Sequence, residues 1–352
     1  MKMKTFGRYL WYRLENSALR TVVFTLLSVI LTQNVVSDCI DAQAIKYNET
    51  GIFMLAVVLG VICTVIPMLE NMGFKNRRNL DTLYFFPIKR EKMALVHYLS
   101  GLIQILFIYT VTFFVAYAYL GINTDYFELY HMVPYYFLSL LLGLVMYSIF
   151  MFIFAQGNTI IDGVVFSLMW AFAIALVMWA LTETVVTELV VTELSSRDNY
   201  QTLVMIRQFP NWGIAYAPIN NLTVIYQNLI EVNMESRYNL EAALRYRDQW
   251  YMFFAWGALG VASAIGYFVT FVRKGAHKAG EISDSWFGYR LLIPIYGYSL
   301  LALIGEIELV TLLIFAAMII GYIIYRRSFK IKGRDLVITA LGIIPLLLGM
   351  VM

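Results

Sequence analysis

Long apolar stretches separated by short polar segments account for most of the chain. A helix that crosses a membrane needs roughly 20 apolar residues, with about 17 to 25 tolerated. Six stretches suit this role, although the first is short: 21–36, 51–69, 94–120, 133–156, 163–181 and 252–272. Three weaker stretches follow at 291–305, which contains Pro294, at 307–325 and at 336–352. None of these stretches alternates apolar with polar residues as membrane β-strands do. The pattern therefore predicts an all-α, polytopic helical membrane protein with six core transmembrane helices and two or three C-terminal ones.

The composition supports the same fold class. Of the 352 residues, 61% are hydrophobic and 14% are charged, whereas a soluble domain has about 25% charged residues. The basic N-terminal segment lacks a small-residue cleavage site, so we do not interpret it as a removable signal peptide. Only two cysteines occur, Cys39 and Cys63, and their positions suggest neither a disulfide nor a metal site.

The positive charges indicate how the chain is oriented in the membrane. Lysines and arginines cluster within residues 2–20, 75–92, 273–290 and 326–334, and residues 94–272 contain no lysine. Cations in short loops tend to stay in the cytoplasm, and the four clusters fall on one side if every predicted span is real. We therefore expect a multi-pass protein of the cell (plasma) membrane with a cytoplasmic N-terminus, and an external segment at 182–251.

Residues 1–20 form a candidate amphipathic segment. Phe6, Leu10 and Leu14 are four residues apart, with Trp11 beside them, whereas Arg8 points elsewhere. This spacing predicts an interfacial helix that leads into the first span. The alternative is an ordinary basic flank that only determines topology.

The external segment contains a second amphipathic pattern. Four apolar residues recur at i, i+3, i+4 and i+7, which places them on one face of a helix: Leu222, Ile225, Tyr226 and Leu229. Two interpretations are compatible, namely a cap packed on the membrane domain and an external gate.

Motifs for chemistry are not found in the sequence. No G-x-x-x-x-G-K-[ST] phosphate loop occurs, and we assign His97, His131 and His277 to different surfaces. Acids are expected at span ends, Glu70 among them, rather than in the middle of spans, and we expect no convergent group of polar residues at one depth. We therefore predict that the chain is not an enzyme and binds no cofactor itself. Aromatic and methionine side chains in the spans favour an amphiphilic or apolar substrate, although ordinary lipid-facing packing explains them too.

The segment "DTLYFFPIKREKM", at 81–93, is apolar and lies in a predicted cytoplasmic loop. Leu80, Leu83 and Tyr84 share one helical face, and Pro87 ends that helix and suits the start of the next. An exposed apolar surface generally marks a partner site. The alternative is an interfacial helix bound to lipid headgroups. Nearby cations such as Arg90 are expected to orient the loop.

The stretch "NLDTLYFFPIKREKMALVHYLSGL" resembles the first cytoplasmic loop of type-2 ABC exporter permeases. That family often shows Asp-x-Leu followed shortly by Leu-Pro-Ile-x-Arg. Asp81, Leu83, Pro87, Ile88 and Arg90 match, while Phe86 replaces the usual leucine. In the family this loop is the coupling helix, which docks on the ATPase subunit.

Other segments extend the resemblance to the bacterial subset with extra C-terminal spans. The N-terminal segment is similar to the family's elbow helix, and "QGNTIID" at 156–162 lies where a second coupling loop belongs. In "RKGAHKAGE", Arg273, Ala279 and Gly280 fit the family pattern, but His277 replaces the usual glutamate. The stretch "RSFKIKG" at 327–333 also resembles that subset.

The resemblance implies a domain organisation. An elbow helix would occupy residues 1–20. A six-span permease core would occupy 21–272, with a coupling loop at 70–93 and the external segment at 182–251. A C-terminal extension would occupy 273–352. The ATPase-binding residues that it implies are Leu80, Asp81, Leu83, Tyr84, Pro87, Ile88, Arg90, Gln156, Gly157 and Asn158.

The resemblance also implies a function. The chain would be the permease subunit of an ABC transporter, working by alternating access on a lipid, peptide or antimicrobial. Its partners would be ABC ATPase subunits, which bind ATP and Mg²⁺, a second permease subunit, identical or related, and the lipid bilayer, with no nucleic acid. An alternative is a sensor or immunity module of the same fold that detects or expels antimicrobials. A third class is an enzyme. A neighbouring gene that encodes a phosphate loop would favour the transporter or the sensor over the enzyme.

Overall fold

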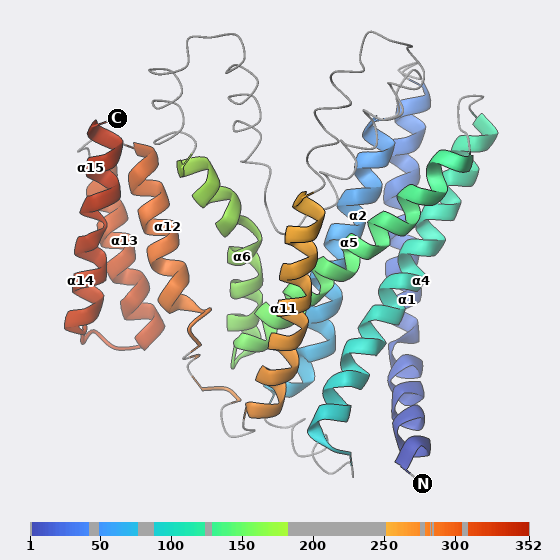
Figure 1. The fold of residues 1–352 in the computed structure, drawn as a ribbon, viewed down its shortest axis with the longest axis horizontal. Coiled ribbons are helices and arrows are strands. Elements are labelled where there is room, and N and C mark those ends of the chain that lie inside the picture. Colours follow the sequence, from blue (N-terminus) through green and yellow to red (C-terminus); the bar gives the residue numbers. More distant parts are fainter. Residues whose placement is uncertain are drawn as a thin grey trace. The chain divides into compact units, whose positions relative to one another are not determined.

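The computed structural model describes residues 2–41, 49–76, 88–123, 129–181, 251–274, 279–281, 283, 285–304 and 309–351. In these residues the regular elements are helices, and no strand occurs (Figure 1). Seven of the described helices are long and apolar enough to cross a membrane. The chain is therefore an all-α polytopic membrane protein, which confirms the predicted fold class.

The helices form two compact units, made of residues 1–155 with 215–279 and of residues 156–214 with 280–352. Unit 1 contains α1 (Lys2–Asp41), α2 (Glu49–Asn71), η1 (Met72–Lys75), α4 (Arg90–Asn123), α5 (Leu129–Gln156, except its last residue) and α11 (Tyr251–Arg273). Unit 2 contains α6 (Ile160–Leu181), α12 (Tyr289–Ile304), α13 (Leu309–Arg326), α14 (Gly333–Leu341) and α15 (Ile343–Val351). The contacts group α6 with the C-terminal helices, whereas the sequence-based division placed it in a six-span core.

In unit 1, helix α1 is one continuous helix of 40 residues. The predicted amphipathic segment at 1–20 thus continues into the first span without a break, and α1 packs along α4 and α2. Whether residues 1–20 lie along a membrane surface stays a prediction.

Helix α5 is the most buried of the seven described spans. Glycines let its neighbours approach closely, as small residues commonly do between membrane helices. Leu59 of α2 packs over Gly143 of α5, and Gly260 of α11 packs against Val145. The Tyr147 side chain of α5 lies directly over Gly101 of α4. Helix α5 therefore contacts α2, α4 and α11 at these glycines, while α4 packs against α1, α2 and α11.

In unit 2, helix α12 packs against α6, α13 and α15. The Tyr296 hydroxyl donates to the Met169 carbonyl of α6 at 2.7 Å, and Gly297 leaves room for Met318 of α13. The weak predicted span at 336–352 is two helices of nine residues each, α14 and α15, separated at Gly342. Helix α13 is the one long span within the described part of the C-terminal extension.

Candidate functional site

A buried carboxylate lies near the end of α2, inside the candidate membrane span Leu55–Lys75. The Glu70 side chain has no exposed surface, and two arginines of α1 pair with it. An Arg13 guanidinium nitrogen lies 2.7 Å from Glu70 Oε2, while Arg20 pairs with Oε1. The two arginines are seven residues apart, which puts both on the same face of the helix. Helix α1 therefore presents two positive charges to one buried acid.

Helix α4 contributes two further side chains, again seven residues apart. Gln104 Nε2 donates to Glu70 Oε1 at 2.8 Å, and Gln104 Oε1 accepts from Arg20 Nε at 3.1 Å. His97 Nδ1 lies 3.1 Å from the Glu70 backbone carbonyl, and its Nε2 lies 3.2 Å from the Tyr9 hydroxyl. Nδ1 also lies 3.1 Å from an Arg13 guanidinium nitrogen. The guanidinium can only donate and the carbonyl can only accept, so these contacts do not assign the ring proton to one nitrogen.

These six residues are called the Glu70 cluster: Tyr9, Arg13, Arg20, Glu70, His97 and Gln104. A buried charge is costly unless it is paired and hydrogen-bonded. Here the carboxylate receives charge-assisted hydrogen bonds, which are stronger than neutral ones. Removing one partner of a buried ion pair costs about 3–5 kcal/mol. The cluster therefore holds α1, α2 and α4 together by interactions that are expensive to break.

The sequence-based expectation of no convergent polar group is wrong at this site. Arg13 and Arg20 are among the cations at 2–20 from which we predict the orientation. From the sequence we place Glu70 at a span end and His97 on a surface apart from the other histidines. A signal was present in the sequence. Arg13 and Arg20 are seven residues apart, as are His97 and Gln104, and this spacing in or beside apolar stretches indicates polar helical faces. An acid within a span also needs a partner.

The arrangement is suited to holding helices rather than to metal chemistry. It contains one carboxylate and one imidazole, and no group of three or more His, Cys, Asp or Glu side chains in the described residues could hold a metal ion. Both arginines are part of the ion pairs, so the positive charge is directed at Glu70.

An apolar layer covers the cluster. Tyr9, Met93 and Val96 form a buried core, and Phe6, Leu10, Phe74, Ile88 and Phe271 pack around it. The Phe74 ring lies edge-on to His97, with 4.5 Å between ring centroids, and 4.7 Å from Phe271. Phe74, near the start of the predicted coupling loop at 70–93, and Ile88 and Met93, near its end, thus pack in one hydrophobic cluster.

Two lysines attach neighbouring segments to the C-terminal end of α5. Lys75 of η1 donates to the Phe154 carbonyl at 2.6 Å, and its Nζ lies 4.3 Å from the centre of the Phe154 ring. Lys274 donates to the Ala155 carbonyl at 2.8 Å. Lysines commonly bind the last carbonyls of a helix, where the helix dipole favours positive charge. The start of the loop is therefore also attached to α5.

Only part of the predicted ATPase-binding set lies in the described residues. Ile88 is half-buried against Met93 and Val96, whereas Arg90 is exposed and its guanidinium lies 3.5 Å from the Lys274 carbonyl. The remaining members of the loop lie outside the described residues: Leu80, Asp81, Leu83, Tyr84 and Pro87. The predicted cap or gate also lies outside them: Leu222, Ile225, Tyr226 and Leu229.

The second predicted loop, Gln156, Gly157 and Asn158, packs against the segment that follows residue 279. The Gln156 carbonyl accepts from Ser283 at 3.0 Å, and the Gln156 side chain accepts from Ser285 at 2.7 Å. Asn158 is buried. Its side chain thus lies inside unit 2 rather than on an open surface.

Glycines make this packing possible. A Cβ on Gly157 would lie 2.6 Å from the backbone nitrogen of Gly163, so only glycine fits there. Gly280 has a φ of 81°, a conformation that favours glycine, and its N–H donates to the Asn158 carbonyl at 3.0 Å. Gly280, from one stretch that carries the family resemblance, therefore contacts Asn158, from another, within unit 2.

No family model, no curated protein and no solved structure matches the chain. The class that the fold defines is a helical, multi-span membrane protein. The resemblance to ABC permeases continues to rest on the sequence patterns described above.

Proposed function

We propose that the chain is the membrane-spanning permease subunit of an ABC exporter, driven by separate ATPase subunits. Its substrate would be amphiphilic or apolar, and two permease subunits, identical or related, would form the pathway. The proposal is supported by the resemblance at 79–102, by the seven described helices that could span a membrane, and by the lack of a phosphate loop in the sequence.

The observation that carries the proposal is the anchoring of both ends of the predicted coupling loop. At its start, Glu70 is ion-paired to α1 and Lys75 is bonded to α5. At its end, Ile88 and Met93 pack in the apolar layer, one turn before His97 of the cluster. A surface loop without a mechanical role has no need of this buried attachment.

The anchoring suggests how ATP use would move the spans. When the ATPase dimer closes, the docked loops of two permease subunits are drawn together. Because the Glu70 cluster joins α1, α2 and α4, these helices would shift as one body rather than bend separately. The spans would then tilt and open to the outside, as alternating access requires.

The test is the double substitution Leu83→Ala with Tyr84→Ala. Neither residue lies in a predicted span, so the chain should insert normally. Burying one such side chain is worth about 1.5–3 kcal/mol, and about 1.4 kcal/mol is tenfold in affinity. We expect loss of co-purification with the ATPase encoded beside the chain, and loss of substrate-stimulated ATP hydrolysis.

The matched control is Lys89→Ala, which removes an exposed cation from the same loop. It should do much less, because exposed charges are screened by salt. Wild-type co-purification and stimulated hydrolysis by the double variant would show that the loop is a lipid-bound segment and not the coupling element.

A further inference from the structure

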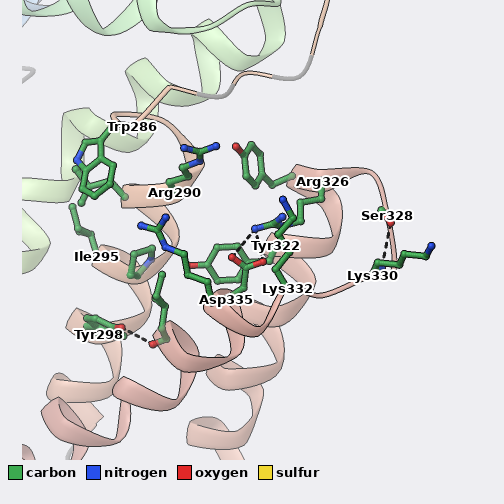
Figure 2. Close-up of a pocket in the computed structure, with 15 residues that line it drawn as sticks. Trp286, Arg290, Ile295, Tyr298, Tyr322, Arg326, Ser328, Lys330, Lys332 and Asp335 are labelled. Carbon is green, nitrogen blue, oxygen red and sulfur yellow. Dashed lines mark hydrogen bonds and ion pairs between the residues drawn. The ribbon is translucent and has the colours of Figure 1, made fainter.

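Unit 2 contains a cavity of about 780 Å³ between α12, α13 and α14 (Figure 2). This is within the range of about 300–1,000 Å³ typical of small-molecule sites. It lies wholly within one unit and includes no residue of the Glu70 cluster. Its residues have no part in the function proposed above.

The lining of the cavity is strongly basic. Five cations and one acid line it, a formal excess of four positive charges: Arg290, Arg326, Lys330, Lys332 and Arg334 against Asp335. Arg326 donates to Asp335 at 2.7 Å, so these two charges compensate each other. No ion pair joins the other four cations to a carboxylate within the part of the chain that the structure describes. The cavity therefore offers uncompensated positive charge to a ligand.

A buried hydroxyl in the cavity wall lacks a partner. Tyr322 is only 2% exposed, and its hydroxyl makes no hydrogen bond within the described residues. Within the described residues, Arg326 Nε–H and Asp335 Oδ2 are likewise buried and without a hydrogen-bond partner. In Figure 2 the Tyr322 ring lies in the middle of the drawn group, beside the Arg326–Asp335 pair. An unsatisfied buried polar group costs about 1–3 kcal/mol. Nε–H can only donate, so the partner that is missing there is an acceptor.

The start of α14 adds to the attraction for anions. Lys332 is the N-cap residue and makes no side-chain capping hydrogen bond. The first N–H groups of a helix have no partner within the helix, and its N-terminus carries partial positive charge. Lys332 and Arg334, on either side of the helix start, both line the cavity. Basic side chains and a helix N-terminus together favour a phosphate group.

Part of the remaining lining is apolar, which favours a lipid over a free anion. Leu291, Pro294, Ile295 and Ile338 form this part of the wall. Phe329, next to the lining residue Lys330, is 89% exposed. A soluble phosphate needs no apolar wall, whereas a phospholipid needs a basic end for its headgroup and an apolar end for its chains. Basic pockets between membrane helices are known to bind lipid headgroups.

We propose that this cavity binds the phosphate-bearing headgroup of an anionic lipid. The phosphate lies among Lys332, Arg334 and the Tyr322 hydroxyl, and the acyl chains lie toward Leu291 and Ile295. The site does not depend on any ATPase partner, so its failure and that of the proposed function are separate results.

The test uses the purified full-length chain in an uncharged detergent, titrated with dioctanoyl phosphatidic acid and followed by calorimetry. Dioctanoyl phosphatidylcholine and inorganic phosphate are titrated in parallel. We expect saturable binding of phosphatidic acid that weakens as salt is raised, and much weaker binding of the other two. Lys332→Gln with Arg334→Gln should weaken binding about tenfold or more, because it removes two positively charged hydrogen-bond donors from the phosphate.

Tyr322→Phe is the sharper variant. The hydroxyl has no partner among the described residues, so its removal should not lower the thermal stability, yet it should weaken phosphatidic acid binding about three- to tenfold. The matched control is Arg327→Gln, an exposed cation that adjoins Arg326 but does not line the cavity. It should change binding by less than about twofold.

Three results would overturn the proposal. Competition by inorganic phosphate at equal concentration would assign the cavity to a soluble anion. Equal binding of phosphatidylcholine would remove the requirement for a net negative headgroup. Wild-type affinity in both the double variant and Tyr322→Phe would place the lipid elsewhere.

Discussion

Glu70 is the residue whose replacement reports most directly on the buried cluster. Glu70→Gln keeps the shape but removes the charge that faces Arg13 and Arg20. Two guanidinium groups would then lie together without a carboxylate. Breaking a buried ion pair costs about 3–5 kcal/mol, so we expect a marked fall in the melting temperature of the purified protein in detergent.

Glu91→Gln is the matched control for this prediction. Glu91 is an exposed acid in the first turn of α4, where a carboxylate contributes about 0.3–1 kcal/mol through the helix dipole. It should therefore change the melting temperature little. Equal melting temperatures for Glu70→Gln and wild type would mean that the cluster does not hold the helices together.

The residue scale is where the sequence was least informative. The resemblance implies that Ile88 is an ATPase-binding residue of the coupling loop, and in the structure it is half-buried against Met93 and Val96. The Glu70 cluster was missed because its members lie on three helices, and one-dimensional patterns do not say which helices pack together. The spacing of Arg13 and Arg20 predicts a shared face, but only the packing of α1 against α2 identifies the acid that this face meets.

At the scale of elements, glycines determine how closely α5 and its neighbours pack. A Cβ on Gly101 would overlap the Tyr147 hydroxyl, which donates to the Tyr98 carbonyl at 2.8 Å. Gly101→Ala should therefore displace Tyr147 and lower the free energy of unfolding by about 1–3 kcal/mol. Denaturant unfolding followed by tryptophan fluorescence would measure the change.

Two further variants separate packing from helix propensity. Gly121 lies in the same helix, and a Cβ there would meet nothing within 4 Å. Gly121→Ala should be neutral or stabilise by up to about 1 kcal/mol, because alanine favours helix. Tyr147→Phe should recover part of the loss in Gly101→Ala, since it removes the overlapping oxygen. If Gly101→Ala changes the free energy of unfolding no more than Gly121→Ala does, then α4 and α5 do not approach each other closely at Gly101.

Helix positions were predictable because apolar runs of spanning length are a strong signal. All six stronger stretches correspond to long described helices. The ends were harder to predict. The tail at 336–352 divides at Gly342, where a Cβ would lie 2.9 Å from the Leu301 side chain of α12, a tertiary contact that hydropathy does not record. The grouping of α6 with α12 also depends on contacts between distant segments.

At the scale of the whole molecule, the distribution of positive charge predicts how the chain is oriented in the membrane, and the fold alone does not determine this orientation. By the positive-inside rule, the cation clusters at 2–20, 75–92, 273–290 and 326–334 predict that four segments lie in the cytoplasm. Counting the predicted spans from there predicts that residues 182–251 lie outside. Two introduced cysteines, one on each predicted side, are sufficient to test this, once Cys39 and Cys63 are replaced by serine.

We expect Asn233→Cys to react with a membrane-impermeant maleimide in intact cells. Asn76→Cys should react only after permeabilisation, because this exposed residue at the end of η1 would face the cytoplasm. Labelling of both variants after permeabilisation is the control that each cysteine is accessible. Labelling of Asn76→Cys in intact cells would reverse the orientation. The loop at 70–93 would then face away from ATP, and the proposed coupling to a cytoplasmic ATPase would fail with it.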